Sequence, residues 1–331
     1  MRAWVWVATL LMVGCSSVAP TPAPVPSVAF LPLALPTPQF PAGVTLPTGI
    51  VANYITATDV ETNGTTVGAL YDQSTGLWTA ISYPAAASTA AYGPAITASG
   101  YRVVGSYKLP GAIYDDAFYY DSASNTFAAI SPPASFCAPN LCNEAIAHSS
   151  YGTTLFDIVG NCDSVTTAPT PLSYPLTAHA FLYIPATATY SLIDMPSAIS
   201  TTAYGIWIDT DTTVAGGFTD AKGTHGYIRG LVSGNIITYD YPGAGITHFE
   251  GITGAGGAGN YNLAGNYNLA GNYSSAAPGS TVFGFWLPVR NWTFGTPIVL
   301  GAVSANSVYQ QTVVGVMPSG ISSTGYIATV P

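Results

Sequence analysis

Hydrophobic and polar positions alternate in short runs along this chain, and the runs form a unit that recurs. The cleanest copy covers residues 202–242. It holds an apolar run with a glycine (VAG, ending at Gly216), a small residue before an aromatic one (Gly226, Tyr227) and an alternating run that ends in Pro242. Such runs, bounded by Gly, Asn, Asp and Ser, predict short strands joined by turns. No window sustains a helical period, so we expect an all-β fold.

Two elements of this unit occur six times each. The first is found as IVANY, VVGSY, IVGNC, VAGGF, GNY and VVGVM, starting at residues 50, 103, 158, 214, 259 and 313. The second is a small residue before an aromatic or apolar one, at Ala69, Ala117, Ala180, Gly226, Gly284 and Gly325. Once the insertion SFCAPNLC and the duplicated AGNYNL are set aside, the period is about 46 residues, which predicts a six-bladed β-propeller.

The third element is a strand that ends in proline, at Pro84, Pro132, Pro196 and Pro242, and the last repeat lacks it. At the other end of the chain, the segment from Gln39 to Gly43 is similar to the segment that contains Pro242. We therefore expect N-/C-terminal strand closure, in which residues 39–43 complete the last blade and leave few free edges. The propeller is predicted to span residues 39–331.

The N-terminal residues predict export. Residues 1–14 contain Arg2 and an apolar run too short to span a bilayer, which is typical of a signal peptide. The LMVG sequence before Cys15 resembles a bacterial lipobox, which implies a lipoprotein signal with lipidation of Cys15; an ordinary signal peptide with an incidental thiol is the alternative. Ser16 implies sorting to the outer membrane. Residues 15–38, with alternating prolines, predict a semi-rigid tether.

Charge excludes one class of partner. Without Arg2 the chain has five basic and fifteen acidic residues, so its net charge is near −10. Because phosphate binding requires clustered Lys and Arg, we expect no nucleic-acid partner. Only 6% of residues are charged, and the acidic ones are scattered. The prediction is a monomeric protein that is lipid-anchored to the bacterial outer membrane or cell surface.

Several words of the repeat carry a family resemblance. His179-Ala180-Phe181, its echo at His225-Gly226-Tyr227, and the AYGI and VVG-x-Y words resemble the bacterial extracellular repeat proteins named for the His-Ala-Phe (HAF) tripeptide. The resemblance covers roughly residues 40–331 and implies an exported β-repeat protein with no agreed biochemical activity. Three of the six copies lack the histidine, which argues against a histidine role common to all repeats. We expect His179 and His225 to be strand-start residues held by a neighbouring strand.

Three cysteines lie close together in the sequence beyond Cys15. In an exported protein they should oxidise. Proximity favours a disulfide between Cys137 and Cys142, although Cys162 with either of them is also possible. A metal site is less favoured, even with His148 nearby, because no compact fourth ligand is present. We predict no metal and no cofactor, since phosphate loops and dinucleotide fingerprints are absent from the sequence.

The functional prediction rests on tyrosines. Tyr92, Tyr151 and Tyr204 each precede a glycine in AYGP, SYGT and AYGI, and Tyr309 is a looser counterpart. On an innermost strand they would ring one end of the channel and bind sugar rings or peptides through their flat faces and hydroxyls; core packing between sheets is the alternative. We expect a glycan- or protein-binding or structural module.

The sequence favours an enzyme less than it favours a binding or structural module. The sequence has no GxSxG elbow, and its histidines fall at unrelated repeat positions. The alternative is a propeller-type carbohydrate-active enzyme, a glycoside hydrolase or lyase, which would need two carboxylates to converge at the channel mouth. The candidates for that pair are Asp115, Asp116, Asp209, Asp211, Asp240 and Glu250.

Overall fold

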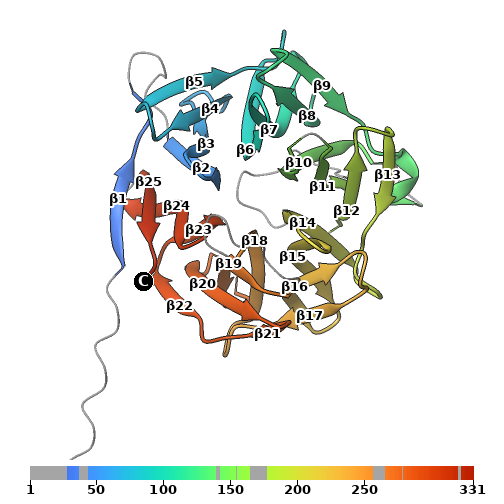
Figure 1. Cartoon of the computed structure of the whole chain (residues 1–331), viewed down its shortest axis with the longest axis vertical. Helices are drawn as coiled ribbons and strands as arrows, with labels where there is room; N and C mark the ends of the chain where they lie inside the picture. Colours follow the sequence, from blue (N-terminus) through green and yellow to red (C-terminus); the bar gives the residue numbers. More distant parts are fainter. Residues whose placement is uncertain are drawn as a thin grey trace, which may run out of the picture.

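The computed structural model describes residues 28–36, 44–138, 142–153, 155–164, 177–255, 265–277, 279–319 and 322–331. In these residues 25 β-strands and one short 3-10 helix, η1 (Ala134–Cys137), form a ring of sheets around a common axis (Figure 1). The all-β propeller prediction is confirmed. No helix in the described residues is long and apolar enough to cross a membrane. The predicted signal peptide, Cys15 and residues 15–27 and 37–38 of the predicted tether lie outside the described residues.

Each blade is built from strands that follow one another outward from the axis. The innermost strands are β2 (Val44–Val51), β6 (Ser88–Thr97), β10 (Glu144–Tyr151), β14 (Ser200–Ile208), β18 (Ile246–Gly254) and β23 (Ser304–Tyr309). The second strands are β3 (Tyr54–Val60), β7 (Gly100–Lys108), β11 (Asp157–Asp163), β15 (Thr212–Asp220), β19 (Tyr267–Ser274) and β24 (Thr312–Ser319).

Farther from the axis lie the third and outer strands. The third strands are β4 (Thr66–Asp72), β8 (Asp116–Asp121), β12 (His179–Ile184), β16 (Gly223–Gly230), β20 (Phe283–Arg290) and β25 (Ser322–Thr329). The outer strands are β5 (Leu77–Ile81), β9 (Thr126–Ile130), β13 (Thr189–Leu192), β17 (Ile236–Tyr239), the pair β21 (Thr293–Phe294) and β22 (Ile298–Gly301), and β1 (Ala29–Leu33).

Hydrogen bonding divides these strands into sheets. Four sheets have four strands each, and a nine-stranded sheet joins β14–β17 to β18–β22 through a single parallel pair, Thr224 with Ile246. Over the described residues this gives six units, which we number as blades 1 to 6 from β2. All other pairings are antiparallel. They join consecutive strands, except for the pairs of β20 with β22 and of β1 with β25.

The last blade is closed by the N-terminal side of the chain. β1 pairs with β25 over five residues, from Ala29 with Thr329 to Leu33 with Gly325, and the two strands lie side by side in Figure 1. Closure therefore occurs, but the prediction that residues 39–43 supply the strand is wrong, and so is the domain start at residue 39. The N–H of Leu35 donates to Thr45 Oγ1 as that of Tyr83 donates to Thr89 Oγ1, so Pro36 matches Pro84.

Two of the predicted first-element copies are also out of register. IVANY spans the end of β2 and the turn after it, and the second strand of blade 1 is β3, where Ala57 stands in the glycine position. In blade 5 the second strand contains Gly271, from the third AGNY word rather than the first, which lies outside the described residues. All six copies of the second element lie on third strands, as the period predicts.

The core is formed where the repeated words meet. The third-strand rings of Phe118, Phe181, Tyr227, Phe285 and Tyr326 are fully buried. The second-strand glycine lies beneath such a ring: a Cβ at Gly105 would lie 2.8 Å from Phe118 and 2.0 Å from a carbonyl oxygen of β6. Glycine is required there because backbone and ring approach too closely for any side chain. This contact explains why the VVG and small-aromatic words recur together.

Candidate functional site: the central channel

All six innermost strands carry a β-bulge at the same position. The register against the second strand shifts by one residue in each, and the extra residues are Thr48, Tyr92, His148, Tyr204, Glu250 and Asn306. A bulge bends the strand and redirects one side chain. The repetition therefore gives every blade one redirected side chain at the same level of the channel, and that side chain differs from blade to blade.

Polar side chains of the preceding blade hold several of these bulges. Asn161 accepts a hydrogen bond from the N–H of Ala203 at 2.7 Å, and Asn272 accepts one from the N–H of Ala305 at 2.7 Å. Thr58 Oγ1 accepts from the N–H of Ala91 at 3.1 Å. In each case the accepting residue lies on a second strand and the donor lies just before a bulge in the next blade. These bonds satisfy buried backbone groups that the bulge would leave unpaired.

The channel narrows to a small cavity between the bulges and the ends of the inner strands. Its lining comes from all six inner strands, from residues 48–51, 93–94, 148–151, 204–207, 250–253 and 307–309. The free volume is about 40 Å³, which is room for roughly three waters. A sugar ring or peptide therefore does not fit inside this level of the channel and would have to bind across its mouth.

Aromatic rings gather where the inner strands end. The rings of Tyr151 and Trp207 lie with centroids 4.3 Å apart at an angle of 46°. Burial raises the pKa of the Tyr151 phenol to about 12, with further contributions from its neighbours Tyr309 and Asp209. We call Tyr151, Trp207 and Tyr309 the aromatic end of the channel. It offers flat apolar faces and hydroxyl groups, and the carboxylate of Asp209 is nearby.

The predicted site tyrosines are only partly brought together. Tyr151, Tyr204 and Tyr309 line the cavity, whereas Tyr92 is not among its lining residues. Tyr92 and Tyr204 share the bulge position, as predicted, but Tyr151 does not: His148 holds that position in blade 3, and Tyr151, three residues on, corresponds to Trp207. Tyr151 is out of register with Tyr92 and Tyr204 because Gly152, the glycine of SYGT, follows β10 instead of lying within it.

His148 and Trp207 are channel residues that the sequence did not predict, whereas Glu250 was among the carboxylates named as candidates for the channel mouth. The ring of His148 lies between Tyr92, at 5.0 Å, and Tyr204, at 4.4 Å between centroids. Burial lowers the pKa of His148 to about 3, so the imidazole is neutral at physiological pH. His148 and Glu250 share one signal, a single residue between an inner-strand apolar position and a following Gly or Ser, as in Ala147-His148-Ser149 and Phe249-Glu250-Gly251, and it is visible only once the bulge is known. Trp207 lies three residues after the bulge of its strand and does not carry this signal.

The carboxylates do not form the pair that a glycoside hydrolase would need at this cavity. Glu250 is the one carboxylate among the described lining residues. It lies 2.9 Å from His248 Nδ1, and Asn272 donates to its Oε1 at 3.3 Å. Glu250 is therefore engaged in a local polar network, and we find no support for the two-carboxylate arrangement in this cavity.

The histidines of the HAF-like words have a local role. His179 Nδ1 lies 2.6 Å from Asp194, and His225 Nδ1 lies 2.6 Å from Asp240. His179 begins the third strand β12, and His225 is the third residue of the third strand β16; in both blades the aspartate follows the outer strand. The expectation that these histidines are held by a neighbouring strand is confirmed.

Within the described residues, one group of three potential metal ligands lies close together: Cys137, Cys142 and Cys162. A disulfide joins the first two, as predicted from their spacing. The sulfur atoms of Cys137 and Cys142 are therefore not free to act as thiolate ligands while the disulfide is intact. His148 belongs to the channel and is not part of this group.

Fold and site together define a β-propeller with a narrow polar channel and one aromatic end. No family model matches this chain, and no curated protein matches it in sequence. Among solved structures it is similar to AofleA from Arthrobotrys oligospora, with a TM-score of 0.52, 10% identity, and coverage of 86% of this chain and 82% of that one. At such low identity the similarity concerns the fold alone.

Two further solved structures have lower scores. TolB from Acinetobacter baumannii has a TM-score of 0.47 and 10% identity over 77% of this chain, which spans 54% of TolB. The β-propeller domain of the Trilobed protease from Pyrococcus furiosus has a TM-score of 0.45 and 8% identity, covering 87% of this chain and 95% of that domain.

Proposed function

We propose that this protein is an envelope-anchored, extracytoplasmic β-propeller lipoprotein that binds a glycan or a surface protein at the aromatic end of its channel. The observation that carries the proposal is the meeting of Tyr151, Tyr204, Trp207 and Tyr309 around one cavity. Aromatic faces with hydroxyl groups beside them are suited to sugar rings and to peptide side chains. Because the cavity is small, the ligand lies across the mouth and inserts at most one small group.

The binding proposal is tested by probing an array of glycans and peptidoglycan fragments with the full chain in detergent. We expect at least one ligand to bind, and its signal to fall at least tenfold in a Tyr151→Leu, Tyr309→Leu double variant. Tyr71→Leu is the matched control, because Tyr71 stacks on Trp78 in blade 1 at 4.8 Å and does not line the channel cavity. Binding that survives in the folded double variant, or an array without a bound ligand, would contradict a glycan site here.

The anchoring part of the proposal rests on the sequence. The apolar run, the lipobox-like residues before Cys15 and the proline-rich segment favour a lipid anchor, and the HAF-like words favour membership of that extracellular repeat family. The Cys137–Cys142 disulfide supports an oxidising compartment. Metabolic labelling with a fatty acid should label the wild type and leave Cys15→Ser unlabelled. Equal labelling of the two proteins would remove Cys15 as the anchor.

A further inference from the structure

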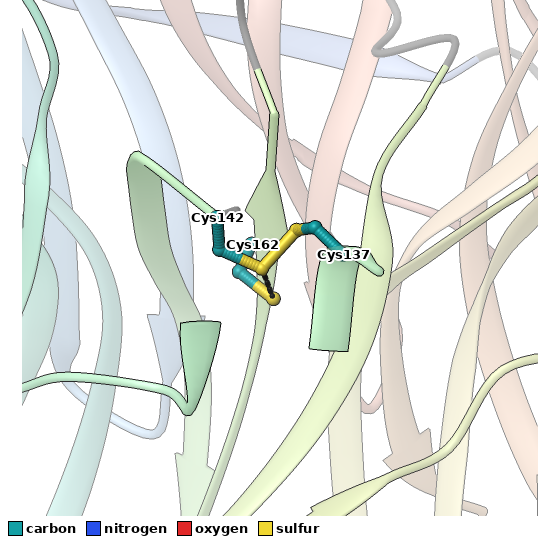
Figure 2. A group of neighbouring side chains, drawn as sticks. All are labelled: Cys137, Cys142 and Cys162. Carbon is teal, nitrogen blue, oxygen red and sulfur yellow. Dashed lines mark hydrogen bonds between the residues drawn. A yellow bond between two sulfur atoms is a disulfide. The ribbon is translucent and has the colours of Figure 1, made fainter. Parts of the chain in front are cut away.

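The insertion between β9 and β10 brings three sulfur atoms together. Cys137 ends η1, Cys142 lies just before β10, and a disulfide joins them. The third cysteine, Cys162, lies in β11, and its Sγ is 3.1 Å from Cys142 Sγ (Figure 2). All three Sγ atoms lie within 4.8 Å of one another. The free thiol thus already touches the disulfide.

We propose that Cys162 is an exchange partner of this disulfide, so that the protein has two cysteine pairings, Cys137–Cys142 and Cys142–Cys162. The thiolate of Cys162 attacks Cys142 Sγ, the new bond forms between these two sulfur atoms, and the Cys137–Cys142 bond breaks. Cys137 leaves as a thiolate and takes up the proton that Cys162 lost. One disulfide and one thiol are present before and after, so no oxidant or reductant is consumed.

The surroundings of Cys162 make this exchange slow at neutral pH. The side chain is buried with Ile158 and Phe181 in an apolar cluster. Burial, more than the nearby Asp194 and Asp163, raises the pKa of the Cys162 thiol to about 12. Because the thiolate is the nucleophile, the exchange rate should follow the thiolate fraction and rise with pH. The Cys162 thiol thus touches the disulfide but exchanges with it slowly, which lets each of the two pairings persist.

The two pairings attach the insertion differently. The Cys137–Cys142 disulfide has a sequence separation of 5 and ties the insertion to itself. A Cys142–Cys162 disulfide would join the insertion to β11, beside the hydrogen bond from Asn143 N–H to Asp163 O and the pair Glu144 with Asp163. Exchange would release η1 from its covalent link and fix the start of β10 to the blade. The pairing therefore controls how η1 is held on the outside of blade 3.

The test is peptide mapping of the full chain without reduction. Trypsin cannot resolve the pairings, because the sequence has no Lys or Arg between Lys108 and Lys222, whereas chymotrypsin can cleave after Leu141, Tyr151 and Phe156 and so separate all three cysteines. In Cys137→Ser treated with oxidised glutathione, we expect a Cys142–Cys162 disulfide. The matched control Cys162→Ser should keep only Cys137–Cys142. Two alkylatable thiols in a folded Cys137→Ser protein would overturn the proposal.

A second measurement covers the case in which Cys137→Ser fails to fold. Wild-type protein is incubated at pH 7 to 10, quenched with acid and an alkylating reagent, and mapped in the same way. We expect the Cys142–Cys162 peptide to form about tenfold faster for each pH unit, with Cys137 carrying the alkyl group. Failure of this peptide to form at any pH would also overturn the proposal.

Discussion

The two ends of the channel differ in how far their residues repeat from blade to blade. Where the inner strands begin, four blades place a threonine three residues before the bulge, and each threonine accepts a hydrogen bond from the backbone N–H of the segment that enters the blade. These residues, which we call the threonine end, are Thr45, Thr89, Thr201 and Thr247. Three residues after the bulge the six blades have five different residue types, with Val51, Ala95, Tyr151, Trp207, Thr253 and Tyr309.

This difference separates what the fold requires from what it leaves open. The threonine end repeats in four blades because each of them ties its entering segment to its inner strand by the same hydrogen bond. No such requirement acts on the aromatic end, where valine, alanine and threonine occupy the same place as tyrosine and tryptophan. Large aromatic residues at positions that the repeat does not need are the best candidates for ligand binding. The predictions below test this division.

The largest effect is expected for Arg102, a framework residue near the aromatic end. Its side chain is 2% exposed, lies over the Phe156 ring with 3.2 Å from Cζ to the centroid, and is 3.6 Å from Asp121. Arg102→Ala removes this contact between blades 2 and 3, and we expect a loss of about 3 to 5 kcal/mol in the free energy of unfolding. Denaturant titration measures it. Arg102→Lys should lose less, and an unchanged midpoint in Arg102→Ala would contradict the structural role.

Glu144, the first residue of the inner strand β10, has a buried carboxyl group. Burial, then repulsion from Asp115, raises the pKa of Glu144 to about 7, and the side chain is 8% exposed. Since its pKa in the folded protein exceeds the unfolded one, stability falls as pH rises from about 4.5 to about 7. Glu144→Gln should therefore gain roughly 2 to 3 kcal/mol at pH 8 and nothing at pH 4. Unfolding of both proteins across pH checks this; equal pH profiles would refute it.

The next largest losses of stability are expected for Asn161 and Asn272, whose side chains accept hydrogen bonds from backbone N–H groups at the bulges. Asn161→Ala leaves the buried N–H of Ala203 without its acceptor, and we expect a loss of about 1 to 3 kcal/mol. Asn272→Ala should lose a similar amount through Ala305. Thermal or denaturant unfolding gives both values. Asn63→Ala is the control, because its hydrogen bonds with Thr65 lie in an exposed turn and its loss should be small.

A threonine-end hydroxyl should have the smallest effect. Thr201→Val keeps the shape of the side chain but removes the acceptor for the N–H of Met195, so we expect a loss of about 1 to 2 kcal/mol. Thr201→Ser, which keeps the hydroxyl, is the matched variant for denaturant unfolding. Similar losses in the two variants would show that the hydrogen bond is not what stabilises this end.

What the sequence could predict follows the same division. The period, the closure and the third-strand rings were predictable because each blade repeats the same contact, as at Phe118 and Phe181. The strand from Ala29 to Leu33 was not, because its short apolar run lies in a proline-rich segment and its partner is at the far end of the chain. The offset between Tyr151 and Tyr204 was hidden because a bulge changes register without any change in the repeat words.

The most direct test of the central claim compares one residue from each end. With a ligand from the array, affinity and unfolding free energy are measured for Tyr151→Leu and Thr201→Val in parallel. We predict that Tyr151→Leu weakens binding at least tenfold with a smaller loss of stability than a buried aromatic would cause, while Thr201→Val loses stability and binds as the wild type does. If Tyr151→Leu unfolds the protein while the ligand still binds its folded fraction normally, the aromatic end is core and the account is wrong.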